Sequence, residues 1–286
     1  MALGRVAVVP TLRYVVVDVF TDAALAGNQL AVFTDARDAN AELMQALTRE
    51  IGFSETTFLV PAEAGGHARV RIFNPRHEMA FAGHPILGTA WVLAQPLQRR
   101  VIELETGMGI VPVEFDRDES GALVFGRMQQ PVPAIRAVDD VDELFEALGL
   151  RGSELPVELY DNGATQIVVT LESPDEVAAL SPDLAAIERF GVTGVNCIAA
   201  LDGRWKNRMF WPLGEDPATG SAAGPIACHL ARHGLVEWGD WIEISQGVEV
   251  GRPSTLFARA DGAGGEIVRV FCGGRAVVVA RGEFRL

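Results

Sequence analysis

The fold is decided by FNPRHEMAFAGHPILGTAWVLA at residues 73–94, which recurs as FWPLGEDPATGSAAGPIACHLA at residues 210–231. Aligned without a gap, the two stretches share seven of their 22 positions at a constant offset of 137 residues. Each predicts a strand end, a turn, and a glycine with small residues that begins an apolar helix. A helix N-terminus carries unpaired backbone N–H groups and a partial positive charge. If the two copies face each other, both helices point at one cleft that suits a carboxylate.

The repeat extends upstream of both stretches. Each half contains two strands, an amphipathic helix and a further strand before the repeated segment. The order strand, strand, helix, strand, strand, helix is therefore predicted twice. The segments are Tyr14–Asp18, Leu30–Phe33, Ala41–Ile51 and Thr56–Val60 in the first half, and Val157–Tyr160, Gln166–Thr170, Asp183–Phe190 and Val195–Ala200 in the second.

The two repeated helices, Ile86–Ala94 and Ala222–Ala231, are apolar on nearly all sides, which indicates that they are buried. Strands wrapped twice around a buried helix predict an α+β fold of two pseudo-symmetric lobes, with the site between them. We expect an N-terminal lobe over residues 10–130, joined by a returning strand at 275–286, and a C-terminal lobe over 131–274. The proline-rich segment Arg127–Val138 is the expected weak join between them.

Composition excludes several classes of protein. The chain has 286 residues, 49% of them hydrophobic and 22% charged, as in ordinary globular proteins. A net charge of −14 argues against binding to nucleic acid or to an anionic membrane. The apolar runs are too short to span a membrane, and the N-terminus does not resemble a signal peptide. Three widely spaced cysteines favour a reducing compartment, so we expect a cytoplasmic protein.

Glu55 is the first candidate for chemistry. It lies in GFSETTF (Gly52–Phe58), between a predicted helix and a predicted strand. It is either an exposed turn carboxylate or a desolvated one whose raised pKa suits proton transfer. The matching region of the second half, Thr193–Val195, contains no acid. Whatever Glu55 does, it does from one side only.

His84 lies just before the first repeated helix, and Asp216 lies just before the second. His84 is either a satisfied structural histidine or a neutral imidazole at a helix N-terminus, able to donate or relay a proton. Asp216 precedes Pro217 and could be a turn or capping residue, an orienting partner of His84, or both. Gly220 and Ser221 would present a backbone N–H and a hydroxyl to an anion, although tight packing also explains them.

Other patterns point to no cofactor and no metal. His229 and His233 have the i, i+4 spacing of helical metal ligands, but no third ligand accompanies them in the sequence. The segment Gly107–Gly109 lacks the remainder of a dinucleotide-binding loop, and there is no P-loop. The segment Gly220–Gly224 misses the spacing of a serine-hydrolase nucleophile elbow by one residue.

Four motifs together resemble the PhzF-like isomerase family, which shares the two-lobed architecture of diaminopimelate epimerase. They are GNQLAVF at Gly27–Phe33, SETTF at Ser54–Phe58, FAGHP at Phe81–Pro85 and EDPATGSAAGP at Glu215–Pro225. The resemblance extends over nearly the whole chain. Trp211 departs from it, since this position is usually smaller in the family, and its side chain could narrow the pocket.

The resemblance implies a cofactor-independent isomerase acting on trans-2,3-dihydro-3-hydroxyanthranilate in phenazine biosynthesis. Glu55 would move a proton from C3 to C1 on one ring face, assisted by His84 and Asp216. The substrate would be a small anionic molecule, a cyclic amino acid. The resemblance also implies a homodimer. The expected substrate-binding residues are Asn28, Ser54, Gly83, Gly220 and Ser221.

Two alternatives remain open. The first is another isomerase or epimerase of this fold, acting on a small amino or hydroxy acid. Racemases of this architecture need bases on both faces and use a cysteine at each helix N-terminus, which Phe81–Pro85 and Gly214–Ala222 lack. The second is a non-catalytic binding protein that has kept the fold.

Overall fold

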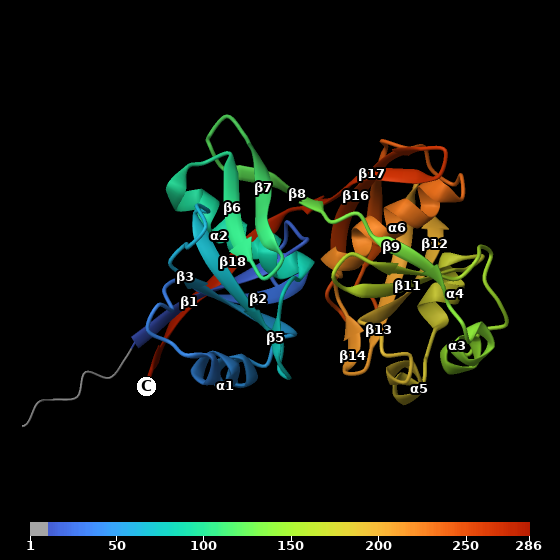
Figure 1. Cartoon of the computed structure of the whole chain (residues 1–286), viewed down its shortest axis with the longest axis horizontal. Coiled ribbons are helices and arrows are strands. Elements are labelled where there is room, and N and C mark those ends of the chain that lie inside the picture. Colours follow the sequence, from blue (N-terminus) through green and yellow to red (C-terminus); the bar gives the residue numbers. More distant parts are fainter. Residues whose placement is uncertain (1–10) are drawn as a thin grey trace, which may run out of the picture.

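The computed structural model describes residues 11–286, which form two similar lobes side by side (Figure 1). Residue 10, the expected start of the N-terminal lobe, lies outside this range, as does part of the N-terminal segment in which no signal peptide was expected. The first half of the chain contains β1 (Thr11–Val19), β2 (Asn28–Phe33), α1 (Ala41–Ile51), β3 (Glu55–Val60), β4 (Ala68–Phe73), β5 (Glu78–Met79), α2 (Gly83–Leu97), β6 (Val101–Thr106), β7 (Gly109–Arg117) and β8 (Leu123–Gln130).

The second half repeats this order with additions. It contains β9 (Ala134–Ala137), α3 (Val141–Leu148), β10 (Glu158–Asp161), β11 (Thr165–Thr170), α4 (Pro174–Ala179), α5 (Leu184–Glu188), β12 (Gly194–Leu201), β13 (Arg204–Trp211), β14 (Gly214–Asp216), α6 (Gly220–Arg232), β15 (Trp241–Gln246), β16 (Ser254–Ala263), β17 (Glu266–Gly274) and β18 (Ala276–Arg285).

Strand pairing repeats as faithfully as the sequence motif does. In the first half β1–β2 is antiparallel, β2–β3 parallel, β3–β4 antiparallel, β4–β6 parallel, and β6–β7 and β7–β8 antiparallel. The same series runs through β10, β11, β12, β13, β15, β16 and β17. The two halves therefore have one topology, an α+β fold in which each half of a continuous sheet packs around its own helix.

The two halves are also joined by pairing. The final strand β18 returns to β1, and β8 pairs with β17 across the middle of the molecule (Figure 1). Within the second half, β9 pairs with β10. On this pairing we propose residues 11–130 with β18 as the first lobe and 131–274 as the second. The segment expected to be a weak join is mostly strand: Arg127–Gln130 belongs to β8, Ala134–Ala137 forms β9, and only residues 131–133 separate them.

The central helices α2 and α6 begin earlier than predicted, at Gly83 and Gly220 rather than at residues 86 and 222. Proline at position 85 fits because a first-turn residue has no intrahelical N–H bond to lose. Nearly every residue of α6, and most of α2, is buried, and one large apolar core surrounds both helices. Burial on all sides explains why neither helix is amphipathic.

Helix prediction was weaker in the second lobe. The helix expected at Asp183–Phe190 is the shorter α5, and Asp183 is its N-cap, accepting from the backbone N–H groups of Ala185 and Ala186. Two further helices, α3 and α4, were not predicted. Ser173 caps α4 and Pro174 begins it, so the sequence does contain a start signal for this helix. Within residues 11–286, no helix combines the length and apolar character needed to cross a membrane.

Candidate active site

The N-termini of α2 and α6 touch between the lobes. A Cβ atom on Gly83 would lie 2.6 Å from the carbonyl carbon of Gly220 and 2.6 Å from the nitrogen of Ser221. Only glycine permits this approach, because real Cβ atoms do not come so close to backbone atoms. The first N–H groups of both helices, which intrahelical bonding leaves free, are therefore brought together. Their partial positive charges add at one point.

A cavity of about 300 Å³ opens at this meeting point. Its wall includes the predicted Glu55, His84 and Asp216, together with Ser54, Gly83, Gly220 and Ser221. Trp211 also lines it, as the resemblance suggested. Further lining residues, not singled out from the sequence, are Asn74, Arg76, His77, Met79, Thr165, Thr193, Met209 and Thr219. A cavity of this size suits a small molecule.

Glu55 is the first residue of β3 and its side chain is only 15% exposed. Burial raises its pKa to about 8, the negative charge of Asp216 adds to the rise, and a hydrogen bond from Ser54 opposes it. The atom Oε2 is buried without a hydrogen-bond partner. A carboxyl group that titrates near neutral pH can both accept and return a proton.

His84 is the second residue of α2 and lies 4% exposed. Its Nε2 is 3.5 Å from Oε2 of Glu55, and neither atom has another partner in residues 11–286. Burial lowers its pKa to about 3, although a hydrogen bond that the ring donates to the backbone of Gln29 acts in the opposite direction. The imidazole is therefore neutral at physiological pH and can carry a proton only transiently.

Asp216 ends β14 and lines the same cavity as Glu55. Its Oδ1 accepts from Nδ2 of Asn28 at 2.7 Å, and its Oδ2 accepts from Oγ1 of Thr219 at 2.6 Å. Burial raises its pKa, and these hydrogen bonds oppose the rise. The N-cap of α6 is Thr219 rather than Asp216. The carboxylate is thus oriented by side chains from both lobes.

Asn28 occupies a different place from the predicted one. It is 2% exposed and does not line the cavity. Its Nδ2 donates to Oδ1 of Asp216 and, at 2.9 Å, to the carbonyl oxygen of Ala218, so it links the lobes behind the site. As the first residue of β2 it points inward, a direction that the sequence motif alone does not reveal. Ser54, which does line the cavity, donates to Oδ1 of Asn28 at 3.4 Å.

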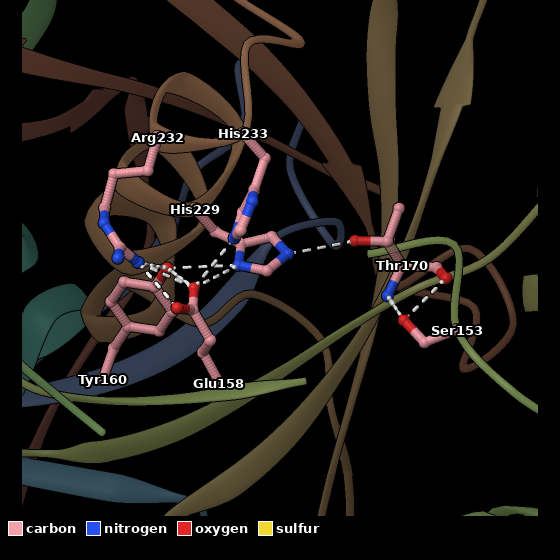
Figure 2. Close-up of polar contacts among 7 residues, drawn as sticks. All are labelled: Ser153, Glu158, Tyr160, Thr170, His229, Arg232 and His233. Carbon is pink, nitrogen blue, oxygen red and sulfur yellow. Dashed lines mark hydrogen bonds and ion pairs between the residues drawn. The ribbon is translucent and has the colours of Figure 1, made fainter. Parts of the chain in front are cut away.

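A second polar cluster lies away from the cavity, at the C-terminal end of α6 (Figure 2). His229 and His233 do have a third potential metal ligand, Glu158 of β10, which sequence spacing could not reveal. Arg232, however, donates to both carboxylate oxygens of Glu158 at 2.7 and 2.8 Å, and Tyr160 donates to Oε2 at 2.6 Å. With its charge already neutralised by a guanidinium, this carboxylate is suited to anchoring the helix rather than to holding a cation.

The fold and the cavity define a class of protein: the two-lobed proteins of diaminopimelate-epimerase-like architecture, whose site lies where two central helices meet. The sequence model of the family described as phenazine biosynthesis-like protein matches residues 17–282. The chain belongs to this family, as its motifs predicted.

Curated relatives cover almost the whole chain. Trans-2,3-dihydro-3-hydroxyanthranilate isomerase of Pseudomonas chlororaphis is 46% identical over 277 residues, 96% of this chain and 99% of that protein. The enzyme of the same name from Pseudomonas aeruginosa is 46% identical over 274 residues, 95% of this chain and 98% of that protein.

Solved structures confirm the fold. A PhzF-family phenazine biosynthesis protein of Bacillus anthracis has a TM-score of 0.85 at 23% identity, covering 97% of this chain and all of its own. A hydroxyproline epimerase of Agrobacterium vitis has a TM-score of 0.67 at 16% identity, covering 96% of this chain and 91% of that one. At these identities the likeness concerns architecture alone.

Proposed function

We propose that the protein is a trans-2,3-dihydro-3-hydroxyanthranilate isomerase that works without a cofactor. Relatives of that name at 46% identity, aligned over nearly their full length, support the substrate. The observation that carries the mechanism is the one-sided acid. Pairing places Glu55 opposite Leu30 and, at the equivalent point of the second lobe, Gly194 opposite Gln166. One acid facing one side of a ring suits a hydrogen shift on a single face rather than inversion of a centre.

The geometry suggests how the substrate is held. Its carboxylate would lie against the N–H groups of Gly83, Gly220 and Ser221, where two helix dipoles meet. The ring would then lie between Glu55 and Asp216, with His84 beneath the acid. Fixing the reacting atoms in this way supplies much of the rate, because the reaction becomes effectively intramolecular.

The proton shift needs no other reactant. Glu55, in its ionised form, takes the proton from C3, and the electron pair of that C–H bond moves through the conjugated double bonds of the ring. The protonated Glu55 then returns the proton to C1 on the same face. The enol that results tautomerises to a ketone. A pKa near 8 makes the return step favourable at neutral pH, and His84 can accept a hydrogen bond from the acid or donate one to it.

The decisive variant is Glu55→Gln, which keeps the side-chain volume and removes the acid. We expect it to fold, to bind 3-hydroxyanthranilate, the aromatic analogue of the substrate, and to lose at least about 10³-fold in kcat. Conversion is followed by ultraviolet absorbance and by mass spectrometry in D₂O. Turnover close to that of the wild type would rule out the mechanism.

The position of deuterium then identifies the reaction class. Loss of hydrogen from C3 with little solvent deuterium at C1 supports the isomerase, because Glu55 carries the same proton between the two carbons. Inversion with exchange at an α-carbon of a small amino or hydroxy acid would instead indicate an epimerase. Binding of the analogue with no turnover of any candidate would indicate a binding protein.

The proposal includes assembly and location. We propose a cytoplasmic homodimer, on the family resemblance and on three cysteines, Cys197, Cys228 and Cys272, that are all free and buried. Sedimentation equilibrium at micromolar concentration tests the dimer, and a monomeric mass would contradict it. Fractionation of the cells that express the protein tests the location.

A further inference from the structure

A chain of four buried carboxamides runs through the second lobe behind the cavity. Gln166, Asn196, Asn207 and Gln246 are 0%, 0%, 1% and 1% exposed. They stand on β11, β12, β13 and β15, which pair in that order. Because a buried amide is costly unless its hydrogen bonds are made, a row of four requires an explanation.

Asn207 donates in both directions from the middle of the row. Its Nδ2 lies 3.2 Å from Oδ1 of Asn196 and 2.9 Å from Oε1 of Gln246. Toward one end, Nδ2 of Asn196 donates to Oε1 of Gln166 at 2.9 Å. Nε2 of Gln166 then donates to Oγ of Ser221 at 3.1 Å. This arm ends in the cavity wall, at the N-terminus of α6.

The other arm ends at the acid. Nε2 of Gln246 donates to Oγ1 of Thr219 at 2.9 Å and to the backbone oxygen of Asp216 at 2.7 Å. The hydroxyl of Thr219 in turn donates to Oδ2 of Asp216 at 2.6 Å. Both arms therefore reach residues that line the cavity, Ser221 and Thr219, which flank the first residue of α6.

Backbone groups fix the direction of every bond in the chain. Oε1 of Gln246 accepts from the N–H of Thr219 at 3.2 Å, while its Nε2 donates to a backbone carbonyl. Nδ2 of Asn196 also donates to the backbone oxygen of Ile167 at 3.3 Å. A backbone N–H cannot accept and a carbonyl cannot donate, so these amides cannot be turned over. Asn207 must therefore donate twice, and its own Oδ1 is left without a partner in residues 11–286.

The first lobe has other residue types at the strand positions equivalent to those of the four amides. The pairing registers place four residues at the equivalent points of β2, β3, β4 and β6, and only two of them carry a hydroxyl. Because the fold is made without amides in one lobe, the amides of the other are not needed for topology. The equivalent residues are Leu30, Thr57, Val70 and Thr106.

We propose that Gln166, Asn196, Asn207 and Gln246 are positioning residues that set the hydrogen-bond polarity of the cavity wall. Ser221 must accept from Gln166, so its hydroxyl hydrogen is left to donate into the cavity. Thr219 must accept from Gln246, so it donates to Asp216 and holds that side chain as an acceptor. This inference rests on the proposed function and extends it. The hydroxyl of Ser221 donates a hydrogen bond to the carboxylate of the anionic substrate, and Asp216 accepts hydrogen bonds from the donor groups of the substrate.

The test is a double-mutant cycle on ligand affinity. Gln166→Met keeps the length of the side chain but cannot donate, and we expect it to weaken binding of 3-hydroxyanthranilate about tenfold by titration calorimetry. The same substitution in a Ser221→Ala background should change the affinity less than about twofold, because the hydroxyl through which it acts is gone. An equal loss in both backgrounds, or no loss in the wild-type background, would overturn the proposal.

A control separates positioning from mere packing. Thr57→Val removes the buried hydrogen bond between Thr57 and Thr89 at the equivalent layer of the first lobe. It should lower thermal stability and leave ligand affinity unchanged. If Gln166→Met does not fold, Gln166→Glu replaces it: an ionised carboxylate compels Ser221 to donate to it, so binding should fall as in Ser221→Ala.

Failure of the proposed function leads to a different result. If the wild type neither converts the substrate nor binds the analogue, the proposed function is wrong. NMR of the ligand-free protein then tests whether the hydrogen-bonded chain of amides exists. The side-chain NH₂ protons of Gln166 and Asn196 should exchange slowly with solvent in the wild type and at least about tenfold faster in Asn207→Leu. If Asn207→Leu leaves these exchange rates unchanged, the proposed network is overturned as well.

Discussion

Glu55 is a carboxyl group that the fold keeps protonated at neutral pH. Its folded-state pKa of about 8 lies above the ordinary value of 4.5, so the folded protein holds a proton that the unfolded chain releases. Its contribution to stability is complete below pH 4.5 and is lost as the pH rises through 8. We therefore expect Glu55→Gln to raise the free energy of unfolding by about 2 kcal/mol at pH 9 and by little at pH 5. Urea denaturation at both pH values checks this, and an equal gain at both would exclude ionisation as the cause.

At the same scale, residue type and local motif were enough to find the groups that face the cavity. His84 and Asp216 could be named because each stands next to the start of a repeated helix, and Glu55 because it is an acid in an otherwise apolar or small segment that has no acidic counterpart in the second half. Asn28 could not be placed, because its direction depends on the pleat of β2. The buried amides were not recognised either: Gln166 and Gln246 look like surface glutamines until the register shows which face of the sheet they occupy. A polar residue in an otherwise apolar strand was the available signal.

The element whose placement matters most is α6, and its far end is anchored by Glu158 (Figure 2). Burial opposes ionisation of this carboxylate, but hydrogen bonds from Tyr160, Arg232 and His233 lower its pKa to about 2. Its contribution is therefore complete above pH 4.5 and is lost as the pH falls through 2. Glu158→Gln should lower the free energy of unfolding by about 2 kcal/mol at pH 7.

That loss should shrink as the solution is acidified, since the wild type then loses the same charge. Burial also lowers the pKa of His229 to about 4, so this histidine adds acid sensitivity between pH 6.5 and 4 in both proteins. Guanidinium denaturation of the two proteins at pH 7 and pH 2.5 measures the difference. A gap of the same size at both pH values would contradict the assigned role of the charge.

The helices and strands that occur in both halves of the sequence were predicted better than those that occur only once. The core helices and their neighbouring strands occur twice in the sequence, so each copy supports the other. The helices α3 and α4 have no counterpart in the first lobe and are only 8 and 6 residues long. Short helices are held by tertiary packing rather than by propensity, and a single sequence pattern predicts them poorly.

For the whole molecule, the contact between the two helix N-termini decides whether the lobes form one site. Gly83→Ala places a Cβ 2.6 Å from backbone atoms of Gly220 and Ser221, which cannot yield as a side chain would. The helices must separate, so we expect a loss of about 2 kcal/mol in unfolding free energy and at least about tenfold weaker binding of 3-hydroxyanthranilate.

The matched substitution is Gly152→Ala, where no atom lies within 4 Å of the added carbon and the backbone is not left-handed. It should leave both stability and affinity close to the wild type. Calorimetric titration and thermal denaturation of the two variants measure the effect of the contact directly. If Gly83→Ala were stable and bound the analogue normally, the carboxylate would not be held where the helices meet. Both the proposed substrate orientation and the reason for two facing glycines would then have to be abandoned.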